Sequence, residues 1–193
     1  MTRTATVDRK TKETNIHCHL NLDGAGHYEI DTGIGFLDHM LTHLSKHSRI
    51  DMTLKAKGDL HVDGHHTVED VGICLGEALA KALGDKKGIA RYGASSVPME
   101  DALANVAIDL SGRPFCVYNA GYRTERIGDF DVECVEELLR AFSNSGRLNL
   151  HANVPYGTNS HHIAEAIFKA LGQSLAQAIR IVGNEIPSTK GTL

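Results

Sequence analysis

The stretch DGHHTVEDVG, residues 63–72, has a near copy in NSHHIAEAIF, residues 159–168. Each copy places two adjacent histidines before an apolar helical pattern, and a glutamate follows three residues after the second histidine. A second helical pattern precedes each copy at a similar distance, carrying His39 in the first case and Glu137 in the second. Self-similarity at matched positions predicts that the chain consists of two related halves.

The expected secondary structure follows the same order in both halves. Residues 14–30 alternate apolar and polar positions around a glycine-containing turn, which predicts a β-hairpin. Apolar periodicity then predicts helices and a strand, and the second half repeats the series. The first half supplies a helix at 35–48, a strand at 50–58 and a helix at 67–85; the second supplies paired strands at 102–122, a helix at 132–146, a strand at 147–155 and a helix at 161–181.

The connection between the halves is expected at residues 88–96, GIARYGASS, because glycine and serine favour turns and loops. The sequence therefore predicts an α+β fold of two tandem half-domains, residues 1–92 and 93–193. Each is expected to be a mostly antiparallel sheet with two helices packed on one face.

The composition excludes several classes of protein. A chain of 193 residues with 41% hydrophobic and 23% charged residues is typical of a globular protein. Its apolar stretches are too short to cross a bilayer and its first residues lack the pattern of a secretory signal, so a cytoplasmic protein without a membrane partner is expected. The net charge of -4 argues against nucleic acid as a partner. Four separated cysteines without a CxxC pair are typical of reduced core residues.

The repeated motif carries residues that ligate metal ions. Neighbours on a helix point about 100° apart, whereas residues three or four apart share a face. We therefore expect His66 to act with Glu69, and His162 with Glu165, while the preceding histidines face elsewhere. The predicted sets are His66, Glu69, His39 and His161 for one ion, and His162, Glu165, Glu137 and His65 for its twin. Imidazole and carboxylate without thiolate favour Mn²⁺, Fe²⁺ or Zn²⁺.

Other histidines and charged residues leave alternatives open. His43 and His47 follow His39 at helical spacing, and they either line the same pocket or form the polar stripe of an amphipathic helix. Arginine suits phosphate through its fork of donors, and lysine beside hydroxyls suits the same ligand. The candidates for an anion site are Arg91, Arg113, Lys169, Ser188, Thr189 and Lys190, each of which is alone more typical of a solvated surface.

Six ordered motifs resemble the imidazoleglycerol-phosphate dehydratase family. They are TGIGFLDHMLTHLSKH (32–47), HVDGHHTVEDVGICLG (61–76), ARYG (90–93), DLSGRPF (109–115), NSHHIAEAIFKA (159–170) and PSTKG (187–191). The resemblance runs from about Glu13 to the C-terminus. It implies a duplicated fold, two Mn²⁺ ions, a homo-oligomer of 24 subunits with active sites between subunits, and dehydration of D-erythro-imidazoleglycerol phosphate to imidazole-acetol phosphate in histidine biosynthesis.

The resemblance also implies residue roles. It assigns metal binding to His39, His65, His66, Glu69, His161, His162 and Glu165, and Glu137 stands where many relatives carry histidine. It assigns substrate contacts to Glu13, His47, Arg91, Arg113, Lys169, Ser188 and Lys190, beside which we place Thr189 and the ligands His39, His65 and His161. Glu13 is the expected acid/base group. Glu100 and Asp101 invert the acidic order expected at that position.

The implied reaction suits a duplicated metal site. When both ring nitrogens of an imidazole bind metal ions, the ring becomes an imidazolate that can expel the neighbouring hydroxyl. Two other functions use similar ligands: a dinuclear metal-dependent hydrolase such as a phosphatase, and a structural protein assembled by its metals.

Overall fold

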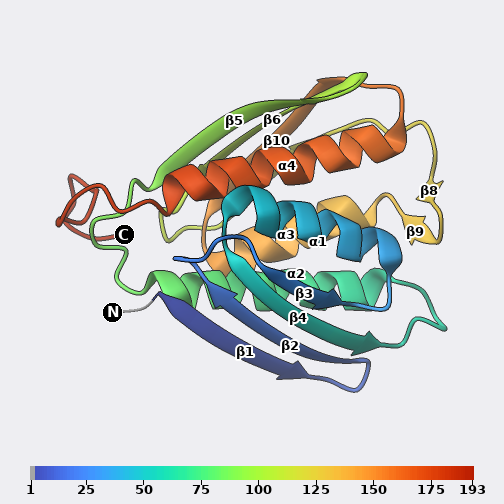
Figure 1. The fold of residues 1–193 in the computed structure, drawn as a ribbon, viewed down its shortest axis with the longest axis horizontal. Coiled ribbons are helices and arrows are strands. Elements are labelled where there is room, and N and C mark those ends of the chain that lie inside the picture. The colour runs from blue at the N-terminus through green and yellow to red at the C-terminus, as the bar shows by residue number, and fades with distance from the viewer. Residues whose placement is uncertain (1–2) are drawn as a thin grey trace.

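One order of strands and helices occurs twice in the computed structural model, which describes residues 3–193 (Figure 1). The first half contains β1 (Thr4–Lys10), β2 (Thr14–Asn21), β3 (Tyr28–Asp31), α1 (Gly35–Ser48), β4 (Asp51–Gly58) and α2 (His65–Leu83). The second half contains β5 (Tyr92–Met99), β6 (Ala102–Asp109), β7 (Phe115–Asn119), the short pair β8 (Arg126–Ile127) and β9 (Phe130–Asp131), α3 (Cys134–Gly146), β10 (Asn149–Tyr156) and α4 (Ser160–Ala178).

The two large sheets have matching topologies. Their strand orders are β1-β2-β4-β3 and β5-β6-β10-β7. All neighbours are antiparallel except the last edge strand, because β3 runs parallel to β4 and β7 runs parallel to β10. The expected α+β class, with a mostly antiparallel sheet in each half, is therefore confirmed. The division between residues 92 and 93 stays a prediction.

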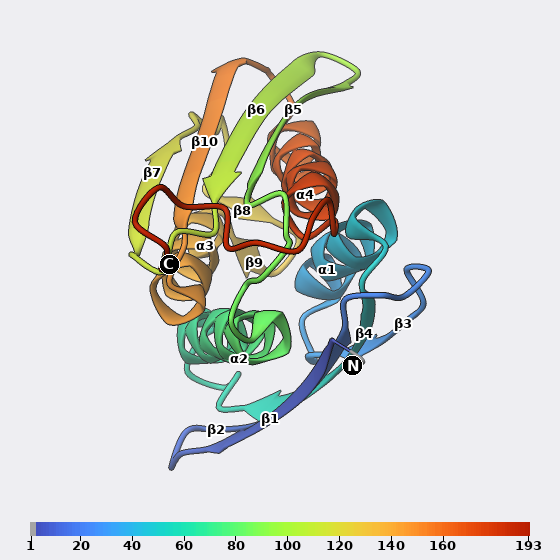
Figure 2. The same ribbon diagram turned by 90° about the vertical axis from the view of Figure 1, so that its left-hand side faces the viewer.

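The helices form a layer between the two sheets (Figures 1 and 2). Alternation along the strands turns one face of each sheet inward, as in β2, where Thr14, Ile16, Cys18 and Leu20 are buried. In the first half α2 packs on β1 and β2, and in the second α4 packs on β5 and β6; the halves join where α2 meets α3 and α1 meets α4. The N-terminal ends of α1, α2, α3 and α4 lie at the same end of the molecule (Figure 1).

The predicted hairpins are wrong, although most of their residues form strands. β2 pairs with β1 and β4, while β3 pairs only with β4, so residues 14–30 form no hairpin. Likewise β6 pairs with β5 and β10, and β7 pairs only with β10, so 102–122 are not paired with one another. β2 instead forms its hairpin with β1, a largely exposed edge strand. β6 forms its hairpin with β5, which starts within residues 88–96, where a connection is expected.

Two expectations from composition concern the interior and the membrane. Cys18, Cys74 and Cys134 are buried and Cys116 is half-buried, and all four are free thiols, as predicted. Burial raises the pKa of the Cys74 thiol to about 12, as expected of an inert core residue. Among residues 3–193, no helix is both long enough and apolar enough to span a bilayer.

Candidate active site

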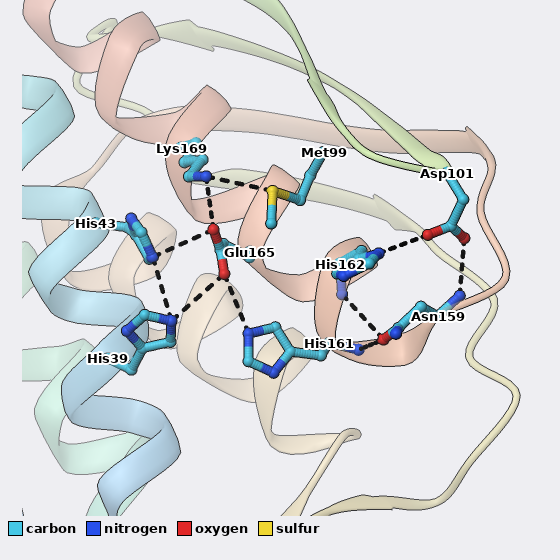
Figure 3. A network of polar contacts seen from close by, with 9 residues as sticks. All are labelled: His39, His43, Met99, Asp101, Asn159, His161, His162, Glu165 and Lys169. Atoms are coloured by element: carbon cyan, nitrogen blue, oxygen red, sulfur yellow. Dashed lines mark hydrogen bonds and ion pairs between the residues drawn. The ribbon is translucent and has the colours of Figure 1, made fainter.

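Glu165, in the second turn of α4, is surrounded by three histidines (Figure 3). Its Oε2 lies 3.1 Å from His161 Nε2 and 3.4 Å from His39 Nε2, and its Oε1 lies 3.4 Å from His43 Nε2. The side chain of Glu165 is only 6% exposed. Ligand atoms of His39, His43 and Glu165 all lie within 4.8 Å of one another, which makes this group a candidate metal site. We call Glu165, His39, His43 and His161 the Glu165 cluster.

Helix packing brings the Glu165 cluster together. α1 lies against α4, and on α1 His39, His43 and His47 follow one another at intervals of one turn. The rings of His39 and His43 are 4.5 Å apart between centroids, and those of His43 and His47 are 5.9 Å apart. His43 therefore belongs to the cluster, and His47 continues the same stripe away from it.

The charges in the cluster suit a cation ligand. Burial would raise the pKa of Glu165, but the Lys169 ammonium 2.5 Å away and the neighbouring His43 lower it to about 2. Burial lowers the pKa of His43 to about 4, more than the Glu165 carboxylate raises it. At neutral pH the pair is thus an ionised carboxylate and a neutral imidazole, the forms that bind metal ions.

The contacts within the second motif differ from the expected pairing of His162 with Glu165, which as a pair of metal ligands stays a prediction. His161 faces Glu165, whereas Nδ1 of His162 lies 2.6 Å from Asp101 Oδ1 on the other side of the helix start (Figure 3). Residues four apart are offset by about 40° and residues three apart by about 60°, so both spacings share a face and neighbouring groups decide between them. Here Asp101 holds His162, which leaves Glu165 to His161.

The first motif lies apart from the cluster. His66 Nδ1 is 3.0 Å from Asp59 Oδ2 and 4.0 Å from Glu13 Oε2, while Glu69 is exposed and His65 half-buried. No hydrogen bond or ion pair within residues 3–193 joins this motif to the Glu165 cluster. Each predicted ligand set combines residues of both motifs, so both sets stay predictions, and a neighbouring chain would have to supply the first motif. Glu137, half-buried in the first turn of α3, stays an untested ligand.

Most of the candidate anion-binding residues lie at the opposite end of the molecule. Arg91 donates to both carboxylate oxygens of Asp109, at 2.7 and 3.1 Å, and to the Pro187 carbonyl at 2.8 Å, so it holds the chain next to Ser188. Its backbone N–H donates to the Ala178 carbonyl in the last turn of α4. At about 1.5 Å per helical residue, Arg91 is about 20 Å from Glu165.

The remaining anion candidates divide between the two ends. Ser188, Thr189 and Lys190 follow Pro187, and Arg113 neighbours Gly112, which approaches the C-terminal Leu193. Lys169 is the exception, since its ammonium contacts Glu165. Within one chain, the Glu165 cluster and Lys169 thus lie at one end, and the other candidate anion-binding residues lie at the far end.

A cavity of about 800 Å³ borders the cluster. His39 and Phe36 line it from α1, Asp63 and Gly64 from the segment before α2, and the β8–β9 hairpin from the second half. The end of the molecule that carries His39 is therefore hollowed.

Asp59 and Asp101 are site residues that the sequence reasoning missed. The inverted acidic order at Glu100 and Asp101 was a signal without an interpretation, and Asp59 gave none beyond its place after a strand. Asp101 lies far in sequence from His162, with a separation of 61 residues, whereas Asp59 lies only 7 residues before His66.

Comparisons with known proteins agree with the motifs. The family model for imidazoleglycerol-phosphate dehydratase matches residues 32–175. The imidazoleglycerol-phosphate dehydratase of Ruegeria pomeroyi is 56% identical over 99% of this chain and 100% of its own length, and that of Clostridium botulinum is 56% identical over 98% and 97%.

Solved structures with the same description share the fold. The crystal structure of the dehydratase from Staphylococcus aureus aligns with a TM-score of 0.85 and 38% identity, covering 93% of this chain and 99% of that one. The structure from Pyrococcus furiosus aligns with a TM-score of 0.85 and 36% identity, covering 97% and 100%. With its fold, its motifs and nearly its full length in common with these proteins, the chain belongs to the imidazoleglycerol-phosphate dehydratase family.

Proposed function

We propose that the chain removes water from D-erythro-imidazoleglycerol phosphate to give imidazole-acetol phosphate, using two Mn²⁺ ions held by its duplicated histidine motifs. Family membership makes it a hydro-lyase of histidine biosynthesis; the metal, the number of ions and the residue roles are the proposal. The observation that carries it is the Glu165 cluster, a buried carboxylate among three imidazoles.

The donor set fits Mn²⁺, which accepts imidazole nitrogen and carboxylate oxygen. We assign His66, Glu69, His39 and His161 to one ion, and His162, Glu165, Glu137 and His65 to the other. The first motif would complete both sets from a neighbouring chain, supplying His65, His66 and Glu69. A bound divalent ion supplies Lewis acidity, which makes an imidazole ring easier to deprotonate.

The residues around the reacting carbons would handle protons. Electron donation from the ring would help to expel the hydroxyl next to it, which takes up a proton from solvent and leaves as water. Glu13 would take the proton from the next carbon, giving an enol that tautomerises to the ketone. The exposed Glu13 carboxylate beside His66 is suited to this role, because it remains free to reach a substrate.

The phosphate would be held by residues from another subunit. Arg91, Arg113 and residues Ser188–Lys190 are too far from the Glu165 cluster of their own chain to grip the same small molecule. We therefore propose a homo-oligomer, of 24 subunits as the resemblance implies, with sites between chains, in which Lys169 and His47 also contact the substrate. The cytoplasmic location stays a prediction.

Product analysis tests this function against its two alternatives. Purified protein is stripped of metal, reloaded with Mn²⁺ and incubated with imidazoleglycerol phosphate. We expect ketone formation that disappears on chelation and returns with Mn²⁺. Release of free phosphate would indicate a dinuclear hydrolase instead, and the absence of turnover would favour a metal-assembled structural protein.

A further inference from the structure

An aspartate holds the second histidine of the motif in both halves. His162 Nδ1 lies 2.6 Å from Asp101 Oδ1, and His66 Nδ1 lies 3.0 Å from Asp59 Oδ2. The first histidine of each motif has no such carboxylate at Nδ1 among residues 3–193. In each half, therefore, an aspartate contacts the second of the two adjacent histidines and not the first.

The two aspartates occupy different places in the repeated topology. Asp101 directly precedes β6, the second strand of its half, whereas Asp59 directly follows β4. The residue that corresponds to Asp101 in the first half is Glu13, which directly precedes β2. A contact left over from duplication would use corresponding residues. Because the halves make the same contact from different backbone positions, inheritance through the duplication does not account for it, and a functional requirement does.

A carboxylate at Nδ1 determines which ring nitrogen can bind a metal. The Asp101 carboxylate accepts from Thr158 N, Thr158 Oγ1 and Asn159 N on one oxygen and faces His162 with the other, and an ionised carboxylate can only accept. The ring must then carry its proton on Nδ1, which leaves the lone pair of Nε2 free. We propose that Asp101 and Asp59 are positioning residues that fix His162 and His66 in this tautomer, with Nε2 available to a metal ion.

This inference rests on the proposed function, and it also explains why Glu13 is free. Since Asp59 holds His66, Glu13 stays 4.0 Å from His66 Nδ1 with an exposed side chain. In the second half Asp101, which corresponds to Glu13, is itself the residue that contacts the histidine, so it is not free to contact a substrate. The corresponding residues of the two halves thus differ in role: Asp101 positions a histidine, and Glu13 remains available to the substrate.

The two oxygens of Asp101 have separable tasks. Oδ1 accepts from His162, while Oδ2 accepts from Thr158 N, Thr158 Oγ1 and Asn159 N at 2.5, 2.6 and 2.9 Å. An asparagine can keep its oxygen on the loop and turn its NH₂ group toward His162. That group donates to Nδ1 and moves the ring proton to Nε2, where it blocks metal binding.

The test compares Asp101→Asn with Thr158→Val, which removes a hydrogen bond to the same carboxylate but leaves the His162 contact. Mn²⁺ affinity is measured by electron paramagnetic resonance of the free ion, and folding by thermal unfolding. We expect Asp101→Asn to weaken one class of site about 10–100-fold and Thr158→Val to leave affinity unchanged. Asp59→Asn should have a smaller effect, because Asp59 Oδ1 has no partner within residues 3–193 and the amide can turn its oxygen to His66.

A second measurement reads the tautomer without metal. In ¹⁵N-histidine-labelled, metal-free protein, NMR should show one ring changing from the Nδ1–H to the Nε2–H form in Asp101→Asn. Wild-type Mn²⁺ affinity in that variant, an equal loss in Thr158→Val, or an unchanged tautomer would overturn the inference. If the wild type binds no Mn²⁺, the proposed metal function fails, and the tautomer alone decides on the positioning role.

Discussion

Glu13 and Asp101 show how one position acquires two roles. Both directly precede the second strand of a half. Asp101 accepts hydrogen bonds from Thr158, Asn159 and His162, whereas the Glu13 side chain accepts none within residues 3–193. A carboxylate bound to several donors is a poor base, because those donors stabilise its charge. The free carboxylate is the better candidate for moving protons.

Replacing Glu13 therefore tests the chemistry without disturbing the metals. We expect Glu13→Gln to lower kcat by about 10²–10⁴-fold, the usual contribution of a general acid or base, with the Mn²⁺ content unchanged. Ketone formation and elemental analysis measure the two quantities. Glu100→Gln makes the same change in the corresponding turn of the other half and should be silent. Unchanged turnover in Glu13→Gln would remove Glu13 from the mechanism.

Residue types in the site could be predicted from the sequence, but their partners could not. Repetition of HHxxE at matched positions was sufficient to identify the two histidine motifs. It could not decide whether His161 or His162 faces Glu165, since both spacings lie on one helical face. That choice depends on Asp101, which lies directly before β6, far from His162 in the sequence.

At the scale of elements, glycines set the distance between the halves. A Cβ atom added at Gly76 of α2 would lie 2.6 Å from both the Phe142 carbonyl oxygen and the Gly146 nitrogen of α3. One added at Gly72 would lie 2.7 Å from the Leu138 carbonyl oxygen. These obstacles are backbone atoms, which cannot turn aside as side chains do. The α2–α3 contact therefore requires small residues on the inner face of α2.

Gly76→Ala should consequently destabilise the protein. Alanine favours a helix over glycine by about 1 kcal/mol, but the two backbone overlaps force the helices apart, and we expect a net loss of about 1–3 kcal/mol in the free energy of unfolding. Urea unfolding at one fixed protein concentration measures it. Gly183→Ala meets no atom within 4 Å and serves as the control. A variant at Gly76 as stable as the control would show that α2 and α3 separate without strain.

The helices could be predicted from the sequence better than the strand pairing. Apolar periodicity located α1 at its observed residues and the other helices to within a few. β1 buries only Val7, so its alternation was too weak to read, and β5 lies in a glycine- and serine-containing run that resembles a loop. Without these two strands, β2 and β6 were given their next neighbours in sequence as partners.

At the scale of the whole molecule, the chain presents complementary groups at opposite ends. The histidine motifs lie where the helices begin, and most of the cationic candidates lie where α4 ends (Figure 1). A small phosphorylated ligand cannot span about 20 Å within one chain. Symmetric assembly brings the ends of different copies together, so each site would be a product of the oligomer.

Mixing two inactive variants tests whether the sites are shared. Glu13→Gln and Glu165→Gln should each abolish most turnover. If a site takes Glu13 from one chain and Glu165 from another, random co-assembly in equal amounts leaves about a quarter of the sites with both native residues, and activity should return to about a quarter of the wild-type value. Glu13 and His66 lie side by side in one chain, so mixing Glu13→Gln with His66→Ala should restore nothing. No recovery in the first mixture would mean that each chain completes its own site, and the proposed assembly would have to be abandoned.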